Sequence, residues 1–175
     1  TMLDYGAATT PADMAFSPDI AALTNLTPEH TDWHRTVERY YADKLNLIDR
    51  DQPFPVALGR HAVDKPLVLD AVRDRSRLIP PLAPFIEDRL TSAVARSRLK
   101  GSHNLDNATL AARVALKAGA DLEGVVRGIQ KFMPLPHRLE EHQFGDTVFV
   151  NDSISTTPEA TKAALDAYRG KRIAL

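Results

Sequence analysis

The chain has 175 residues, of which 43% are hydrophobic and 26% are charged; its formal net charge is -1 and it contains no cysteine. This length and composition favour one soluble globular domain, or most of one, with a sizeable core. A near-neutral chain without a basic run lacks the positive surface that binds nucleic acid, and no apolar stretch is long enough to span a membrane. Because the chain has no cysteine, disulfides and thiolate metal sites are excluded.

The first half of the chain predicts a strand and a helix. Residues 20–26 form a short apolar run that is typical of a buried strand, and Thr27-Pro28 ends it. From His34 to Ile48 the apolar residues recur at helical spacing, with Lys44 beside the stripe that they form: Val37, Tyr40, Tyr41, Leu45 and Ile48. Residues 51–100 are punctuated by prolines, and we predict no particular element there.

The second half predicts three helices and a hairpin. Residues 104–118 are rich in alanine and form a helix that Gly119 closes. Asp121 caps the next helix, residues 137–150 form a hairpin around Gly145-Asp146, and Thr157 caps a last helix that begins at Pro158. This alternation of short apolar runs and amphipathic helices predicts an α/β fold with a mostly parallel sheet flanked by helices.

Polar side chains gather around the predicted hairpin and the two helices beside it. The order strand, polar loop, helix over residues 148–158 directs backbone N–H groups at an anion, and Asp152 lies at the end of the strand. Arg138 follows Pro136-His137, and its planar guanidinium suits a phosphate or a carboxylate. Alternatively, Asp152 forms a simple turn and Arg138 pairs with a nearby glutamate.

Two further groups of residues have binding chemistry. Asn104 and Asn107 share one face at a helix start, where they are suited to the edge of a nucleobase or act as simple caps. His30, Asp32 and His34 have the residue types of a metal site, but their alternate spacing converges only on a strand, which Pro28 disfavours.

Lys44 lies beside the apolar stripe of its helix, where a lysine often extends its amine into solvent. Burial favours the neutral form of an amine, however, and a neutral amine takes up carbon dioxide. The resulting carbamate supplies oxygen ligands of the kind that magnesium prefers.

The order of these clusters resembles the central domain of the Mur ligases. The resemblance rests on residues 25–32, 40–44, 103–107, 135–138 and 151–153, and it extends over about two thirds of the chain. It implies the fold of that domain in residues 1–170 and the start of a C-terminal α/β domain in residues 171–175. Because neither end reads as a natural boundary, we expect the chain to be an excerpt.

The resemblance assigns roles to individual residues. It implies that His30 assists a magnesium site, that Lys44 is carbamylated, and that both are catalytic. Asn104 and Asn107 would then serve the adenine of ATP, and Arg138 and Asp152 its phosphates and ribose. The polar loop after the hairpin would bind substrate through Ser153, Ser155 and Thr156.

The implied reaction is the ATP-dependent addition of glutamate to UDP-N-acetylmuramoyl-L-alanine, through an acyl phosphate, in peptidoglycan precursor synthesis. The expected cofactors are ATP and Mg²⁺, and the expected protein is a cytoplasmic monomer without nucleic-acid partners. Glutamate-adding Mur ligases usually have a lysine where this chain has Ile154, which favours the variant branch that adds L-glutamate over the branch that adds D-glutamate.

One departure from the family leaves other functions open. The chain contains no G-x-x-x-x-G-K-[ST] loop, which the family uses to hold phosphates and which we expect outside this excerpt. The alternatives are another amide ligase of the superfamily, of the folate polyglutamate or cyanophycin type, a metal-dependent hydrolase built on His30, Asp32 and His34, or a nucleotide-binding module without catalysis.

Overall fold

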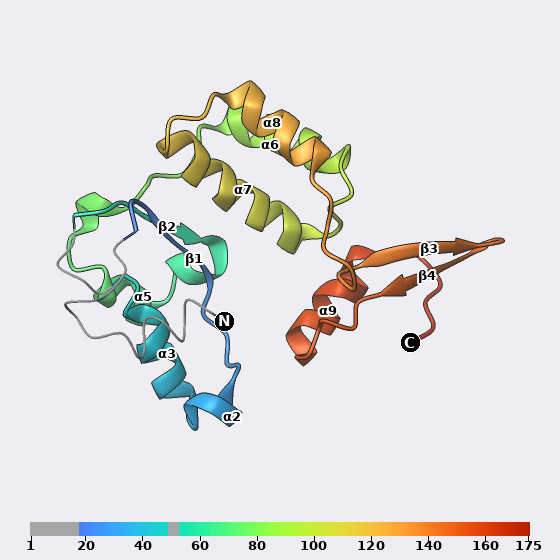
Figure 1. The fold of residues 1–175 in the computed structure, drawn as a ribbon, viewed down its shortest axis with the longest axis horizontal. Helices are drawn as coiled ribbons and strands as arrows, with labels where there is room; N and C mark the ends of the chain where they lie inside the picture. The colour runs from blue at the N-terminus through green and yellow to red at the C-terminus, as the bar shows by residue number, and fades with distance from the viewer. Residues whose placement is uncertain (1–17, 49–52) are drawn as a thin grey trace. The chain divides into compact units, whose positions relative to one another are not determined.

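A computed structural model describes residues 18–48 and 53–175 of the chain. The chain divides into two compact units: residues up to Pro81 together with Arg113–Ala118, and Leu82–Ala112 together with Gly119–Leu175. The α/β class predicted from the sequence is confirmed, because helices alternate with a parallel pair of strands in the first unit and with a hairpin in the second (Figure 1).

The first unit is built on two parallel strands, β1 (Ala21–Asn25) and β2 (Val56–Gly59). β1 is the strand predicted from the apolar run, and β2 lies in the stretch where no element was predicted. Ala21 pairs with Val56 and Leu23 with Leu58. All four residues of β2 are buried, and such a short, fully buried strand carries no alternating pattern by which the sequence reveals it.

Short helices cover this strand pair and complete the core of the unit. They are α2 (Thr31–His34), α3 (Val37–Leu45), α4 (Arg60–Val63), α5 (Pro66–Ala71) and the 3₁₀ helix η1 (Arg75–Arg77). The tightest side chains of the core are fully buried: Leu26, Tyr40, Ile48, Val56, Val68 and Val72.

The helix predicted from His34 onward is interrupted near its start. Arg35 takes a φ of 69°, which ends α2, and α3 begins at Val37 after Thr36, whose side chain accepts a hydrogen bond from the N–H of Arg39 at 3.2 Å. The predicted apolar stripe is otherwise correct, since Tyr40, Leu45 and Ile48 are buried. The result is two helices that meet at a sharp turn.

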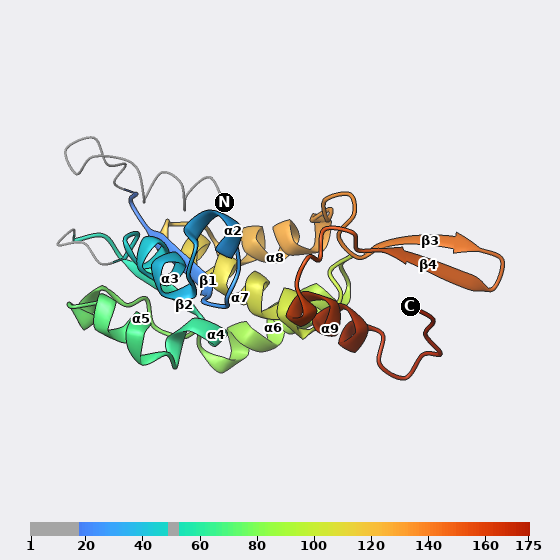
Figure 2. The same ribbon diagram turned by 90° about the horizontal axis from the view of Figure 1, so that it is seen from below.

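The second unit contains four longer helices, one of them only in part, and the hairpin. They are α6 (Pro84–Ala95), α7 (Ser102–Lys117), α8 (Leu122–Lys131), β3 (Glu140–Phe144), β4 (Thr147–Asn151) and α9 (Pro158–Ala167). The hairpin extends past α9 in both views (Figures 1 and 2). Asp121 accepts a hydrogen bond from the N–H of Gly124 at 2.7 Å and Thr157 from that of Ala160 at 3.3 Å, so both predicted helix caps are confirmed.

The C-terminal part of α7 belongs to the first unit, and Arg113 explains why. Its guanidinium donates to the carbonyl of Leu58 at 2.7 Å, to that of Pro80 at 3.1 Å, and to that of Ile79. Three carbonyls at the end of β2 and in the segment after η1 are therefore held by one side chain.

No helix in residues 18–48 and 53–175 is long and apolar enough to cross a membrane.

Candidate functional site

The predicted residues of the first unit surround the ring of Tyr40, which is 1% exposed. The His30 ring lies on one side of it, with its centroid 5.8 Å from that of Tyr40. The Nζ atom of Lys44 lies over the ring, 4.8 Å from its centroid. The structure thus brings His30 and Lys44, 14 positions apart in the sequence, against the same side chain.

The position of Lys44 differs from that of a lysine whose amine extends freely into solvent. Lys44 is half-buried in the last turn of α3, and its amine lies on an aromatic face. Such a contact attracts the charged form of the amine and holds the side chain in one place. Carbamylation of Lys44 stays a prediction, and the cation–π contact describes the amine before any such reaction.

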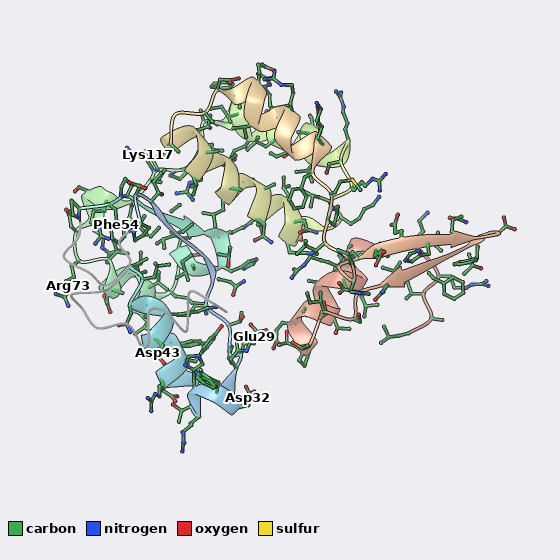
Figure 3. The ribbon with its side chains drawn as sticks, in the orientation of Figure 1. Glu29, Asp32, Asp43, Phe54, Arg73 and Lys117 are labelled. Carbon is green, nitrogen blue, oxygen red and sulfur yellow. The ribbon has the colours of Figure 1, made fainter. Side chains whose placement is uncertain are left out.

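His30, Asp32 and His34 are not gathered into one site. His34 Nδ1 lies 2.7 Å from an Asp43 carboxylate oxygen, whereas His30 Nε2 lies 3.7 Å from a Glu29 carboxylate oxygen. Asp32 and Asp43 project from different helices (Figure 3). In the part of the chain that the structure describes, no three His, Cys, Asp or Glu side chains group around a possible metal position. Of the two predicted catalytic residues on Tyr40, His30 offers a ring nitrogen as it stands, whereas Lys44 offers oxygen ligands to magnesium only as a carbamate. Such a partial set suits an ion that keeps several waters and binds substrate phosphates.

The second unit presents a strained turn at Pro136-His137-Arg138-Leu139. His137 has a φ of 64° and Leu139 a φ of 49°, both in the left-handed region that non-glycine residues rarely adopt. Hydrogen bonds on either side maintain this conformation. The N–H of His137 donates to Glu140 at 2.9 Å, and the N–H of Leu139 donates to Asp152 at 3.0 Å. Strain of this kind persists where the surroundings fix the backbone, which is common at binding sites.

Arg138 lies between the two strained residues with its side chain exposed. Within the described residues it forms no ion pair with Glu140 or Glu141. Glu140 instead lies 3.4 Å from His142, and Glu141 accepts a hydrogen bond from the Tyr168 hydroxyl at 2.9 Å. The alternative of a salt bridge with one of these glutamates is thus not seen in the described part of the chain, and contact of the guanidinium with an anionic ligand stays a prediction.

Asp152 joins this turn to the loop after β4. One carboxylate oxygen accepts from the N–H of Leu139, and the other accepts from the hydroxyl of Ser155 at 2.5 Å. This is the turn-forming role that was the alternative for Asp152. A carboxylate has further lone pairs, so a contact with ribose or metal-bound water stays a prediction. Ser153 and Thr156 are exposed in the same loop.

The start of α7 carries the remaining predicted residues. Asn104 donates to the carbonyl of Lys100 at 2.7 Å and is half-buried, and Asn107 is exposed three positions further along the helix. Neither is the residue before the helix, so neither is an N-cap. Their contacts with adenine stay predictions.

His103, between Ser102 and Asn104, has an environment that the sequence did not reveal. Burial lowers the pKa of its imidazole; Arg138 acts in the same direction, whereas Asp152 and Asp106 oppose the shift. Its Nδ1 atom is buried, without a hydrogen-bond partner among the described residues. The His103 ring, with its pKa lowered, therefore lies within electrostatic reach of Arg138 and Asp152, which are predicted to bind nucleotide.

Residues 5–59 match the Mur ligase middle domain. Over 171 residues the chain is 39% identical to a UDP-N-acetylmuramoyl-L-alanine–L-glutamate ligase of Xanthomonas oryzae, covering 90% of this chain and 36% of that protein. Over 154 residues it is 34% identical to a UDP-N-acetylmuramoylalanine–D-glutamate ligase of Nitratidesulfovibrio vulgaris, covering 87% of this chain and 34% of that protein. The chain thus spans about a third of the length of these relatives.

The fold is also similar to that of a larger protein of known structure. A crystal structure of MurF from Acinetobacter baumannii superposes with a TM-score of 0.70 at 17% sequence identity, over 89% of this chain and 38% of that one. At this identity the likeness concerns the fold alone.

Proposed function

Because the chain belongs to the Mur ligase family, we propose that the complete protein is an ATP-dependent ligase that adds glutamate to UDP-N-acetylmuramoyl-L-alanine during peptidoglycan precursor synthesis. The observation that carries the proposal is the convergence of His30 and Lys44 on Tyr40, within the residues that match the middle domain. These are the two residues to which the resemblance assigns a catalytic role.

The reaction forms one amide bond at the expense of ATP. The muramoyl-alanine carboxylate attacks the γ-phosphorus, giving an acyl phosphate and ADP, and the amine of glutamate then displaces phosphate and loses a proton. Little covalent chemistry falls to the protein, so positioning and charge neutralisation supply most of the rate enhancement. Mg²⁺, when bound, neutralises phosphate charge.

The described residues divide these tasks between them. We propose that Lys44, as a carbamate, and His30 would hold the magnesium, which would supply charge neutralisation for the acyl phosphate. Arg138 would contact phosphate oxygens, Asp152 the ribose or a metal-bound water, and Asn104 and Asn107 the adenine. Ser153, Ser155 and Thr156 would line the glutamate side.

The cellular setting of the protein follows from these substrates. Since ATP and UDP-linked sugars are nucleotides of the cytoplasm, we propose that the ligase acts there. That it acts as a monomer stays an expectation. The loop that holds the ATP phosphates is proposed to lie outside these 175 residues.

The choice of amino acid tests this function most directly. Ile154 is 45% exposed in the loop between β4 and α9, where the D-glutamate branch usually has a lysine. Loss of a charged donor changes how a dicarboxylic amino acid is held with its amine toward the acyl phosphate. We expect product with L-glutamate and at least about 100-fold less with D-glutamate, a discrimination that a polar site can supply.

The experiment incubates the complete ligase with UDP-N-acetylmuramoyl-L-alanine, ATP, Mg²⁺ and one enantiomer at a time, and measures the product by mass spectrometry. Product with D-glutamate alone would show that Ile154 is a tolerated variation. Absence of product with either enantiomer would refute the proposed function.

Arg138→Lys tests the phosphate contact. We expect kcat/KM for ATP to fall by roughly 10- to 100-fold although the charge is kept, because an ammonium group cannot make the two parallel hydrogen bonds of a guanidinium. Arg127→Lys, on the exposed side of α8, serves as the matched control and should leave the rate unchanged. A change of less than about threefold in Arg138→Lys would place Arg138 outside the phosphate site.

A further inference from the structure

Helix α2 is a single turn, and the residues on either side of it both have a positive φ. His30 before it has a φ of 54° and Arg35 after it a φ of 69°. The turn is closed from within by backbone hydrogen bonds: Trp33 N–H and His34 N–H donate to the His30 carbonyl at 3.1 and 2.9 Å, and Arg35 N–H donates to the Thr31 carbonyl at 2.8 Å. An isolated helix of one turn is not stable, because the conformational entropy lost in forming the first turn exceeds the free energy gained from its few hydrogen bonds.

The side chains of His34 and Asp43 form a buried polar contact between α2 and α3. The His34 Nδ1 atom and the Asp43 carboxylate oxygen are 2.7 Å apart, and the side chains are only 4% and 19% exposed. The partners are nine positions apart, on the two helices that meet at the Arg35 turn. A hydrogen bond between such well-buried groups is stronger than one on the surface, and breaking it leaves a buried polar group without a partner.

The His34–Asp43 pair also affects which side chains lie against the Tyr40 ring. The His34 ring lies 5.1 Å from that of Tyr40, centroid to centroid, and His30 lies at 5.8 Å from the same ring. Asp43 is the neighbour of Lys44 on α3, and the Lys44 amine lies over Tyr40. The position of His30 relative to Lys44 thus depends on α2 being held against α3.

We propose that His34 and Asp43 are positioning residues that lock α2 onto α3 and thereby hold His30 beside Lys44. The consequence for catalysis rests on the proposed function, whereas the lock itself does not. Neither residue acts on substrate in this scheme. Their role is to orient the groups that do, as partners of metal-binding side chains commonly do.

The rate of trypsin cleavage after Arg35 tests whether α2 is held against α3, without any assay of ligation. Arg35 is exposed at the turn between the helices, so release of α2 opens the bond after it to cleavage. In the complete ligase we expect Asp43→Ala to be cleaved there about tenfold faster than wild type. Asp43→Asn keeps an oxygen for the hydrogen bond and should stay within about twofold of wild type.

Glu38→Ala removes an exposed carboxylate from the same helix and serves as the matched control, with no expected change. Mass spectrometry of the fragments distinguishes local release from unfolding. Slow cleavage at Arg35 in Asp43→Ala overturns the proposal. Equally fast cleavage at every exposed basic residue also overturns it, since the proposal requires release of α2 alone.

The kinetics of the same variants test the consequence. In Asp43→Ala the Mg²⁺ concentration for half-maximal ligation should rise roughly tenfold, while KM for the UDP substrate stays within about twofold, and Asp43→Asn should restore the wild-type requirement. Faster cleavage with an unchanged Mg²⁺ requirement overturns the positioning role. A wild-type protein without ligase activity would refute the proposed function instead, and the cleavage comparison would still decide whether the lock exists.

Discussion

Replacing Lys44 with alanine in the complete ligase should lower kcat by about 1,000-fold or more while KM for the UDP substrate changes by less than about threefold. The reason is the place of the amine, which lies over the Tyr40 ring with His30 on the same side chain. If the carbamate of Lys44 helps to hold magnesium at the acyl phosphate, its loss weakens interactions made during the reaction more than binding of the UDP substrate. Steady-state kinetics and a direct binding measurement separate the two effects.

The control for this experiment is Lys131→Ala. Lys131 also lies in the last turn of a helix, but its side chain is exposed. We expect its variant to have the wild-type rate. Near-normal turnover in Lys44→Ala would mean that Lys44 only covers the tyrosine ring, as an ordinary lysine at the edge of a core does.

Gly59→Ala should strongly destabilise the first unit. A Cβ atom at Gly59 would lie 2.3 Å from the carbonyl oxygen of Thr24 and 3.1 Å from its Cα, and both atoms belong to the backbone of β1. The backbone φ of Gly59 is -69°, so the glycine is needed for space and not for its conformation. Because backbone atoms cannot rotate away, we expect a loss of about 2–4 kcal/mol in the free energy of unfolding.

Gly128→Ala is the matched control for that prediction. Gly128 lies inside α8, and a Cβ atom there meets nothing within 4 Å. Alanine should therefore raise the free energy of unfolding by up to about 1 kcal/mol, since it favours the helix. Thermal or urea unfolding of both purified variants decides the matter. A Gly59→Ala protein as stable as wild type would show that β1 and β2 separate easily at this point.

The predicted site residues differ in how far the sequence could place them. Arg138 could be placed in a rigid turn because Pro136 precedes it. The two left-handed residues beside it were not predictable, since a positive φ is uncommon for any residue other than glycine, even for a histidine, and is rarer still for a leucine such as Leu139. They are maintained by Glu140 and Asp152, and the Asp152 contact joins positions 13 residues apart.

The sequence by itself determined the elements whose signals are local. The caps at Asp121 and Thr157, the hairpin around Gly145 and the helix closed by Gly119 all depend on residues within a few positions of one another. Hydrogen bonds of this range form in the same way wherever the element lies in the fold, so residue type and spacing suffice to predict them.

Only the tertiary structure decided which segments meet. β2 was not visible as the partner of β1, because a strand of four buried residues has no periodicity and its register depends on the chain between the strands. The break after His34 and its bond to Asp43 were missed for the same reason. The resemblance had assigned His30 and Lys44 to one magnesium site, but local spacing did not reveal that both lie against Tyr40. Contacts between distant residues depend on closing the intervening chain and on what each side chain then packs against, and neither quantity is contained in local spacing.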